Sequence, residues 1–276
     1  MAAPVDTDSA LKDRHRAMWA LGDYPAVATD LILELGTTLV SACGVQPGQR
    51  VLDVAAGSGN AAIPAALAGA QVVACDLTPE MLDAGRQAAA RQGAELAWRQ
   101  GDAEALPFGD GEFHTVMSCV GVMFAPHHQA SADELLRVCR RGGTIGLISW
   151  TPAGFIGQML TAMKPFLAPP PPRTQPAILW GEEDHVRSLF GPRVHDLTTQ
   201  RRTVTIDHFA TPEQFRDYFK ANYGPTVAAY RAISDDPDKV AALDAALDEL
   251  ARRADRGTGR TVMDWEYLLV TARKSG

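Results

Sequence analysis

The stretch that decides the fold is Val51-Leu52-Asp53-Val54-Ala55-Ala56-Gly57-Ser58-Gly59-Asn60. Its first four residues are apolar apart from one aspartate, as in a parallel strand that is covered on both faces. The small residues that follow let the backbone approach a ligand closely, and the helix expected after them offers free N–H groups. This strand, loop and helix are typical of α/β proteins that bind nucleotides or nucleosides.

Short apolar runs continue along the chain at the spacing of repeated β-α-β units. They predict strands at 72–75, 94–99, 116–122 and 145–149, with helices between them. Two later segments, 201–207 and 261–273, also have the residue pattern of strands, and amphipathic helices are expected around them. The predicted architecture is therefore an α/β sheet with late helical insertions that form a lid.

The composition of the 276-residue chain, 46% hydrophobic and 21% charged, is that of a globular protein. A formal net charge of −7 argues against a broad nucleic-acid-binding face. The four cysteines are dispersed without a C-x-x-C pair, so we expect neither a disulfide framework nor a bound metal. Without a recognisable signal peptide or an apolar run of about 18 residues, the expectation is a cytoplasmic protein with no membrane association.

The carboxylate of Asp53 distinguishes two classes of ligand for the glycine loop. It lies four residues before Gly57, at the end of the strand where the ligand of an open α/β sheet binds. Together with Ala62, the glycines give the pattern G-x-G-x-x-A, which is typical of proteins that bind a dinucleotide. The carboxylate of Asp53 argues against that ligand, because it would repel a diphosphate. Asp53 favours a ligand that carries an ammonium group; the alternative is that it only caps the loop backbone.

Two further aspartates follow the next two strands. Asp76 suits the diol of a ribose, with capping of the helix after Thr78 as the alternative. Asp102 is placed to accept a hydrogen bond from an adenine amine, and the Ala103 N–H to reach a ring nitrogen, with Leu77 as part of the wall. Together these residues indicate a nucleoside ligand.

Four segments, in this order, resemble the class I S-adenosylmethionine (SAM)-dependent methyltransferases. The resemblance is strongest to the small-molecule branch that includes the ubiquinone and menaquinone methyltransferases. The segments are 51–59, 75–82 (Cys-Asp-Leu-Thr-Pro-Glu-Met-Leu), 101–108 (Gly-Asp-Ala-Glu-Ala-Leu-Pro-Phe) and 121–126 (Gly-Val-Met-Phe-Ala-Pro). Residues 19–24 also resemble an N-terminal segment that folds over the cofactor in related enzymes.

The resemblance implies a Rossmann-like, doubly wound sheet of seven mostly parallel strands with an antiparallel last strand. It also implies SAM as the cofactor and S-adenosylhomocysteine as its product. Residues 1–44 then form a helical cap over the cofactor, 45–150 the cofactor-binding core, 151–200 and 208–258 the helical insertions of a substrate lid, and 201–207 and 261–273 the last strands of the sheet.

The residues expected to bind the cofactor gather at the carboxyl edge of this sheet and on the cap. The aromatic rings of the cap suit a cationic sulfonium. The full set is Trp19, Tyr24, Asp53, Ala55, Gly57, Ser58, Gly59, Asp76, Leu77, Met81, Asp102, Ala103, Glu104, Cys119 and Met123.

The methyl acceptor is expected to be a small hydrophobic or aromatic molecule, because aromatic and methionine side chains are frequent in both insertions. Methylation of oxygen is favoured over carbon or nitrogen, and a hydroxyl acceptor benefits from a general base. The candidate bases are His127, His128, His185 and His208, with the adjacent pair favoured; the alternatives are a solvated loop imidazole for His127 or His128 and a surface position for His185. No nucleic-acid partner is expected, and the apolar insertions are compatible with a homodimer.

Two other functions fit parts of the sequence. An NAD-dependent oxidoreductase shares the glycine loop, but Asp53 and the lack of a Tyr-x-x-x-Lys pair disfavour it. A SAM-binding protein with a non-methylating activity, either a cyclase or a binding module, would carry the same cofactor loop. The sequence therefore leaves this second alternative open.

The choice of ligand at the glycine loop can be tested by thermal unfolding. S-adenosylhomocysteine at 100 times its dissociation constant is expected to add about 2.7 kcal/mol of stability and raise the melting temperature, because it binds only the native state. NAD at the same concentration is expected to leave the melting temperature unchanged. The opposite ranking, measured by differential scanning fluorimetry, would contradict the assignment.

Overall fold

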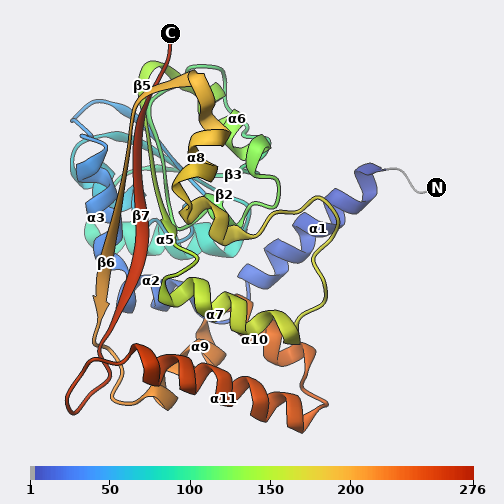
Figure 1. Ribbon diagram of the computed structural model, residues 1–276. Helices are drawn as coiled ribbons and strands as arrows, with labels where there is room; N and C mark the ends of the chain where they lie inside the picture. Colours follow the sequence, from blue (N-terminus) through green and yellow to red (C-terminus); the bar gives the residue numbers. More distant parts are fainter. Residues whose placement is uncertain (1–3) are drawn as a thin grey trace.

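A single sheet of seven strands, in the order β3-β2-β1-β4-β5-β7-β6, forms the centre of the fold (Figure 1). The computed structural model describes residues 4–276, with side chains from residue 8 onward. The strands are β1 (Arg50–Val54), β2 (Gln71–Asp76), β3 (Ala97–Gln100), β4 (Phe113–Cys119), β5 (Cys139–Trp150), β6 (Val194–Ile206) and β7 (Met263–Lys274).

The strand directions confirm the predicted fold class. β1 pairs in parallel with β2 and β4, whereas β7 runs antiparallel to both β5 and β6. The chain leaves β1 toward β2 on one side and later returns to β4 on the other, so the strand order reverses at β1. In open α/β sheets ligands bind at this reversal, outside the carboxyl ends of the strands.

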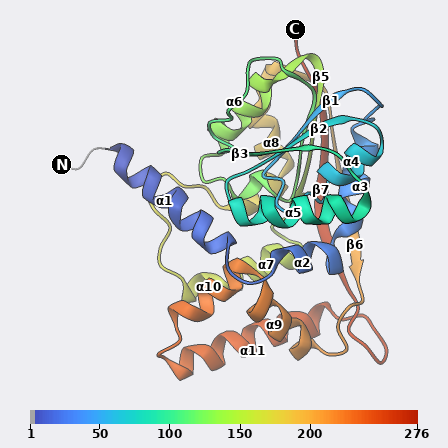
Figure 2. The same cartoon turned by 180° about the vertical axis from the view of Figure 1, so that it is seen from behind.

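Helices cover both faces of the sheet. α3 (Leu33–Ala42), α4 (Ala62–Leu67) and α5 (Pro79–Gln92) pack on one face, and α6 (His128–Val138) and α8 (Glu183–Phe190) on the other (Figures 1 and 2). Val51, Leu52 and Val54 of β1 are therefore completely buried, as their continuous apolarity predicts.

A further group of helices lies beyond the carboxyl ends of the parallel strands, at the bottom of Figure 1. It contains α7 (Phe155–Met163), α9 (Pro212–Asn222), α10 (Gly224–Ala232) and α11 (Pro237–Ala254). Phe155 stacks on Trp265 with ring centroids 5.4 Å apart, and Phe215 and Phe219 pack around them. Most aromatic side chains of the insertions thus form the core of this group of helices, which we call the lid, although its role over a substrate stays a prediction.

The N-terminal segment divides between two roles. α1 (Pro4–Trp19) and α2 (Tyr24–Leu31) lie near the carboxyl edge of the sheet, with α1 against α10 and α2 against α9. α3 instead packs on β4 and β5 as a core helix. The predicted cap of residues 1–44 therefore needs correction, because only its first two helices lie over the edge.

Several predicted strand boundaries also differ from the structure: β3 begins at Ala97 and not at 94, and β5 begins at Cys139 and not at 145. β6 begins at Val194, so the first insertion ends before this residue and not at 200; the early part of β6 is a mostly exposed edge that lacks an apolar signal. β4 ends at Cys119, although the apolar run continues to residue 123. Val120 has a left-handed backbone, with φ of 54°, which ends the strand while its side chain stays buried.

Among residues 4–276, no single helix is both long enough and apolar enough to cross a membrane. α2 and α3 meet that criterion only when taken together, and they are bent by 70° relative to each other.

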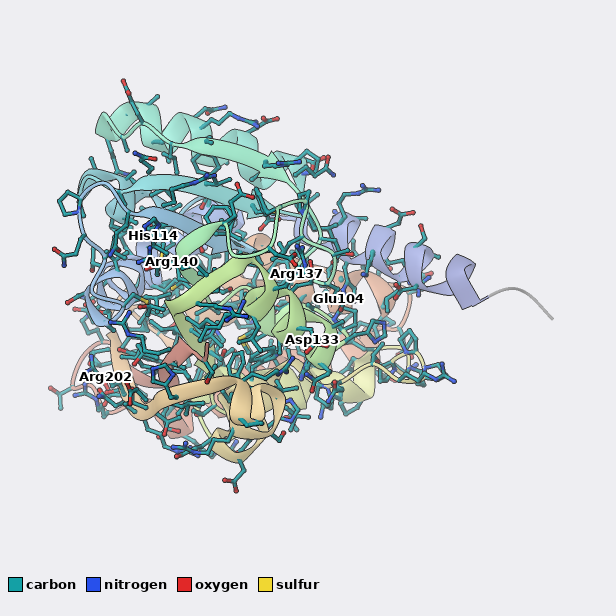
Figure 3. All side chains as sticks on the ribbon, turned by 90° about the horizontal axis from the view of Figure 1, so that it is seen from above. Glu104, His114, Asp133, Arg137, Arg140 and Arg202 are labelled. Atoms are coloured by element: carbon teal, nitrogen blue, oxygen red, sulfur yellow. The ribbon has the colours of Figure 1, made fainter. Side chains whose placement is uncertain are left out.

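An arginine on α6 braces the loop that follows β3. Arg137, labelled in Figure 3, donates hydrogen bonds to the carbonyls of Leu106 and Phe108 at 2.9 and 2.7 Å and pairs with Glu134 at 2.6 Å. Glu134 in turn accepts the Leu106 N–H at 2.6 Å. The charge-assisted bonds to this loop fix the chain directly after the expected adenine-binding residues.

The packing of α3 against the start of α4 gives a stability prediction. A Cβ on Gly36 would lie 1.8 Å from the Asn60 carbonyl oxygen, so the two segments touch through bare backbone. Gly36→Ala is expected to lower the free energy of unfolding by about 2 kcal/mol through this clash, although alanine is the better helix former by about 1 kcal/mol.

Urea denaturation followed by circular dichroism measures this change. Ser41→Ala, at an exposed position of the same helix, is the matched control and is expected to stay within about 0.5 kcal/mol of the native protein. A stabilised Gly36→Ala variant would show that α3 does not approach α4 this closely.

Candidate functional site

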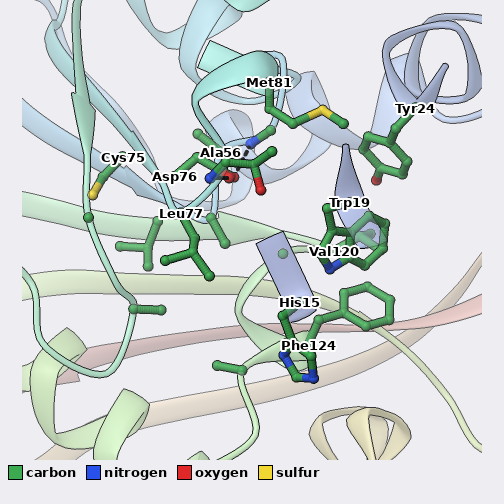
Figure 4. Close-up of a pocket in the computed structure, with 18 of the residues that line it drawn as sticks. His15, Trp19, Tyr24, Ala56, Cys75, Asp76, Leu77, Met81, Val120 and Phe124 are labelled. Atoms are coloured by element: carbon green, nitrogen blue, oxygen red, sulfur yellow. Dashed lines mark hydrogen bonds between the residues drawn. The ribbon is translucent and has the colours of Figure 1, made fainter. Parts of the chain in front are cut away.

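A cleft opens at the carboxyl ends of β1, β2, β3 and β4, beneath α1 and α2 (Figure 4). Its space, including the open solvent at its mouth, is about 970 Å³. It is lined by Lys12, His15, Trp19, Tyr24, Ala28, Val54, Ala55, Ala56, Gly57, Ser58, Asn60, Cys75, Asp76, Leu77, Thr78, Met81, Gly101, Asp102, Ala103, Cys119, Val120, Gly121, Phe124, Ala125 and Pro126.

The floor of the cleft contains strained backbone. Ala55, directly after β1, has a left-handed φ of 51°, and Val120, directly after β4, one of 54°. The two turns meet closely, since a Cβ on Gly121 would lie 2.2 Å from the Ala55 carbonyl oxygen. Such strain in non-glycine residues costs of order 1–3 kcal/mol each and is concentrated at functional sites.

Asp76 fixes the conformation of the glycine loop. One of its carboxylate oxygens accepts the Gly57 N–H at 2.8 Å, and the other accepts the Thr78 N–H at 2.8 Å. Burial raises the pKa of Asp76, and these backbone N–H groups oppose that rise. The carboxylate therefore holds the loop and also reaches the cleft, where its remaining lone pairs can accept hydrogen bonds from a ribose diol.

Asp53 lies beneath the loop and not on the surface of the cleft. It is 1% exposed, and neither carboxylate oxygen has a hydrogen-bond partner among the described residues. Burial raises its pKa to about 8; the nearby Ala62 N–H, which does not reach normal hydrogen-bond geometry, opposes this rise, and the charge of Asp76 adds to it. The expected direct contact with a ligand ammonium is therefore not supported by its position. A cationic ligand would instead attract Asp53 through space and favour its ionised form.

One face of α1 reaches into the cleft. Lys12 forms ion pairs with Asp102 and with Glu104, the latter at 2.7 Å. Burial lowers the pKa of Lys12, but its hydrogen bonds to these two carboxylates outweigh that effect and raise it. Glu104 also accepts the His127 N–H at 2.6 Å. The ammonium of Lys12 thus joins α1 to the loop after β3, a partnership that the sequence did not indicate.

Aromatic rings form the opposite wall. The Trp19 ring lies 5.4 Å from Tyr24, 4.8 Å from Phe124 and 5.7 Å from Tyr223, each in an edge-to-face arrangement. We call Trp19, Tyr24, Phe124 and Tyr223 the aromatic wall; Tyr223 stands behind the other three, at the end of α9. Burial raises the pKa of Tyr24, so its hydroxyl remains protonated near neutral pH.

The two histidines favoured as bases are not among the cleft-lining residues. His127 Nε2 lies 2.9 Å from an Asp8 oxygen, outside the cleft. His128 is completely buried, with Nδ1 2.9 Å from His185 Nε2, and burial lowers its pKa to about 4. Because α6 begins at His128, the adjacent side chains point to different neighbours, and this geometry gives neither one a contact with a ligand in the cleft.

Most of the expected cofactor residues do meet in the cleft. Those are Trp19, Tyr24, Ala55, Gly57, Ser58, Asp76, Leu77, Met81, Asp102, Ala103 and Cys119. Gly59 packs against the Trp98 and Ile63 side chains, and Met123 is completely buried beneath the site. Sequence reasoning missed Lys12, His15 and Asn60. Lys12 and His15 could have been found only from their spacing to Trp19, which places all three side chains on one face of a helix.

Asp8, Glu104 and His127 place three possible ligand atoms within 4.8 Å of one another. The Lys12 ammonium already lies 3.6 Å from Asp8 and 2.7 Å from Glu104. The ammonium group of Lys12 thus already supplies a positive charge next to these carboxylates.

Comparison with known proteins agrees with this geometry. The sequence family described as "Methyltransferase domain" matches residues 51–143, which run from β1 into β5. An uncharacterised protein of Mycobacterium tuberculosis is 52% identical over 271 residues, 98% of each chain, so the match includes the lid. A demethylmenaquinone methyltransferase of Renibacterium salmoninarum is 39% identical over 123 residues, which cover 42% of this chain and 50% of that one.

Among solved structures, a candidate methyltransferase from Bacillus halodurans has a TM-score of 0.57 with this chain. The superposition covers 87% of this chain and 99% of that chain at 21% identity. At this sequence identity, the similarity shows that the two chains share a fold.

The unpaired carboxylate beneath the loop gives a pH-dependent stability prediction. An acid whose pKa rises from about 4 in the unfolded chain to about 8 in the folded protein contributes stability below pH 4 that is lost as the pH rises through 8. Asp53→Asn removes that loss. Between pH 5 and pH 8.5, the stability of the ligand-free variant relative to the native protein is therefore expected to rise by about 4 kcal/mol, because the native protein loses about 1.4 kcal/mol per pH unit up to pH 8.

Urea unfolding at the two pH values measures the difference, with the exposed Asp235→Asn as the control. A constant difference between Asp53→Asn and the native protein at both pH values would mean that Asp53 does not titrate in this range.

Proposed function

Because the chain belongs to the class I SAM-dependent methyltransferases, we propose that it methylates a hydroxyl oxygen of a small, planar, hydrophobic acceptor. One observation carries the proposal: a single cleft joins the Asp76-held glycine loop to the uncharged aromatic wall. The first part suits a nucleoside with a cationic tail, and the second suits a flat acceptor next to it.

The residues present fit the cofactor. Gly57 leaves its side of the loop open, since a Cβ there would meet only the Tyr24 ring, at 3.6 Å. Asp76 is placed to accept hydrogen bonds from a ribose, while Asp102, Ala103 and Leu77 line the part of the cleft proposed for adenine. The buried carboxyl group of Asp53 has no hydrogen-bond partner among the described residues, and an ammonium group bound nearby would favour its ionised form.

When bound, SAM supplies a methyl group that is already activated by the sulfonium. The chain then has to orient the acceptor in line with the methyl group and exclude water. Trp19, Tyr24 and Phe124 present ring faces and edges that attract a cation and pack on an aromatic acceptor. No carboxylate or ammonium group belongs to the aromatic wall, which favours an acceptor without charge.

Two observations favour oxygen and a ring acceptor. The cleft contains an imidazole, that of His15, which can take up the proton that a hydroxyl releases. The similarity to a demethylmenaquinone methyltransferase supports an acceptor with a fused aromatic ring. From that relative we take only the expectation of a ring in the acceptor, and not the identity of the methylated atom.

Product analysis tests the proposal directly. The protein is incubated with SAM carrying a deuterated methyl group and with 1-naphthol, 1,4-dihydroxynaphthalene or a flavonol, and the products are analysed by mass spectrometry. A labelled methyl ether is expected from at least one acceptor.

Asp76→Asn is expected to reduce this activity by at least tenfold, mainly through weaker cofactor binding, because charge-assisted hydrogen bonds of about 1.5–3 kcal/mol are lost. Glu80→Gln, at an exposed position of α5, is the control and is expected to keep the native rate. Tight binding of S-adenosylhomocysteine without transfer to any acceptor would instead favour the non-methylating alternative.

A further inference from the structure

The cleft contains one histidine, and it belongs to the N-terminal helix. His15 lies on α1 between Lys12 and Trp19, each about one helical turn away, and all three line the cleft. Figure 4 shows His15 and Phe124 together at one side of the cleft, below Trp19. We propose, on the basis of the function proposed above, that His15 is the general base that removes the proton from the acceptor hydroxyl.

The helix that carries the imidazole is anchored on both sides of His15. Toward the start of α1, Lys12 is held by Asp102 and Glu104. Toward its end, Trp19 packs edge-to-face on Tyr24, Phe124 and Tyr223. These two anchors hold the segment of α1 that carries His15 at the cleft, and general-base catalysis requires such a fixed position.

The protonation state of His15 suits a base. Burial lowers its pKa, and the positive charges of Arg14 and Lys12 on the same helix, together with His127 at the start of α6, lower it further. Asp102 and Glu104 are paired with Lys12, and no carboxylate among the described residues contributes to the pKa of His15. His15 is therefore neutral at pH 7, and within the described part of the chain no side-chain hydrogen bond contributes to its pKa.

The other titratable groups at the cleft are less suitable. Burial raises the pKa of both Cys119 and Tyr24, so each keeps its proton near neutral pH and is a poor base. Asp76 is occupied by two backbone N–H groups. His127 and His128 do not line the cleft.

The transfer step balances with His15 in this role. A lone pair of an imidazole nitrogen takes the hydroxyl proton, and the acceptor oxygen forms a bond to the methyl carbon. The bond from that carbon to sulfur breaks, and its electron pair neutralises the sulfonium. The imidazolium then returns its proton to solvent through the open mouth of the cleft. No oxidant or further reactant is needed.

This assignment specifies the acceptor more closely. A base is needed only when the hydroxyl is protonated at neutral pH, as in a phenol with a pKa of about 10. An acceptor that is already ionised would react without His15. The natural acceptor is therefore a weakly acidic phenol or an alcohol that enters the cleft uncharged.

The test compares His15→Asn with the native protein on acceptors of different acidity. With 1-naphthol, His15→Asn is expected to lower kcat by about 10²–10³-fold, with little change in the KM for SAM. With 4-nitro-1-naphthol, which is ionised at neutral pH, the loss is expected to shrink to less than tenfold. The native kcat is expected to be constant above pH 7 and to fall below pH 6, and the variant is expected to lack this fall.

His195→Asn, at an exposed position of β6, is the control and is expected to retain the native rate and pH profile. A purely structural role for His15 would reduce the rate with both naphthols equally. An unchanged rate and pH profile in His15→Asn would overturn the assignment of the base while leaving methyl transfer intact. Failure of the native protein to methylate any acceptor would overturn the proposed function, and the role of His15 with it.

A binding measurement separates the two failures. In ¹H–¹³C spectra of the seven histidine rings, the His15 signal is identified by its absence in His15→Asn. Addition of 1-naphthol to the complex with S-adenosylhomocysteine is expected to shift this signal and to leave that of His195 in place. A bound naphthol that does not shift the His15 signal would contradict the proposed contact.

Discussion

The two hydrogen bonds that Asp76 accepts from Gly57 and Thr78 connect the end of β2 to the loop after β1 and to the start of α5. Every other part of the cleft is built around this arrangement. The left-handed turn at Ala55 brings the loop against Gly121 and so sets the distance between β1 and β4 at the floor. Charge-assisted bonds to a buried carboxylate are strong enough to hold such strained backbone in place.

The same region places two carboxyl groups where little solvent reaches. Asp53 is buried and Asp76 is half-buried at the loop, and the loss of solvent raises the pKa of each. An arrangement of this kind costs stability in the ligand-free protein and is relieved by a ligand with a positive tail. The site therefore resembles other functional sites in which stability is lowered locally so that a ligand can be bound selectively.

α1 gives the cleft its third side and couples the cofactor end to the acceptor end. Lys12 contacts the carboxylates after β3, and Trp19 contacts the aromatic wall. The contact of Lys12 is ionic, so ionic strength is expected to act mainly on it, whereas acceptor binding is expected to act mainly on the ring contacts of Trp19. Both influence the imidazole of His15 between them. The lid contributes Tyr223 to this wall from a segment about 200 residues away along the chain.

Local signals in the sequence determined the sheet and the cofactor loop. The apolar run of β1, the glycines at 57 and 59 and the aspartate after β2 are adjacent in the chain or recur at fixed spacing, so their meeting at one sheet edge follows from the topology of parallel strands. The tertiary structure alone decided the rest. Asp53 was expected at a ligand and lies beneath the loop, and His127 and His128 were expected in the cleft and lie outside it.

The direction of a side chain at the start of a helix depends on its packing partners, as His128 shows through its contact with His185. For the same reason, only the docking of α1 on the edge of the sheet placed His15 in the cleft, since the contact joins segments that are remote in sequence and no local pattern encodes it.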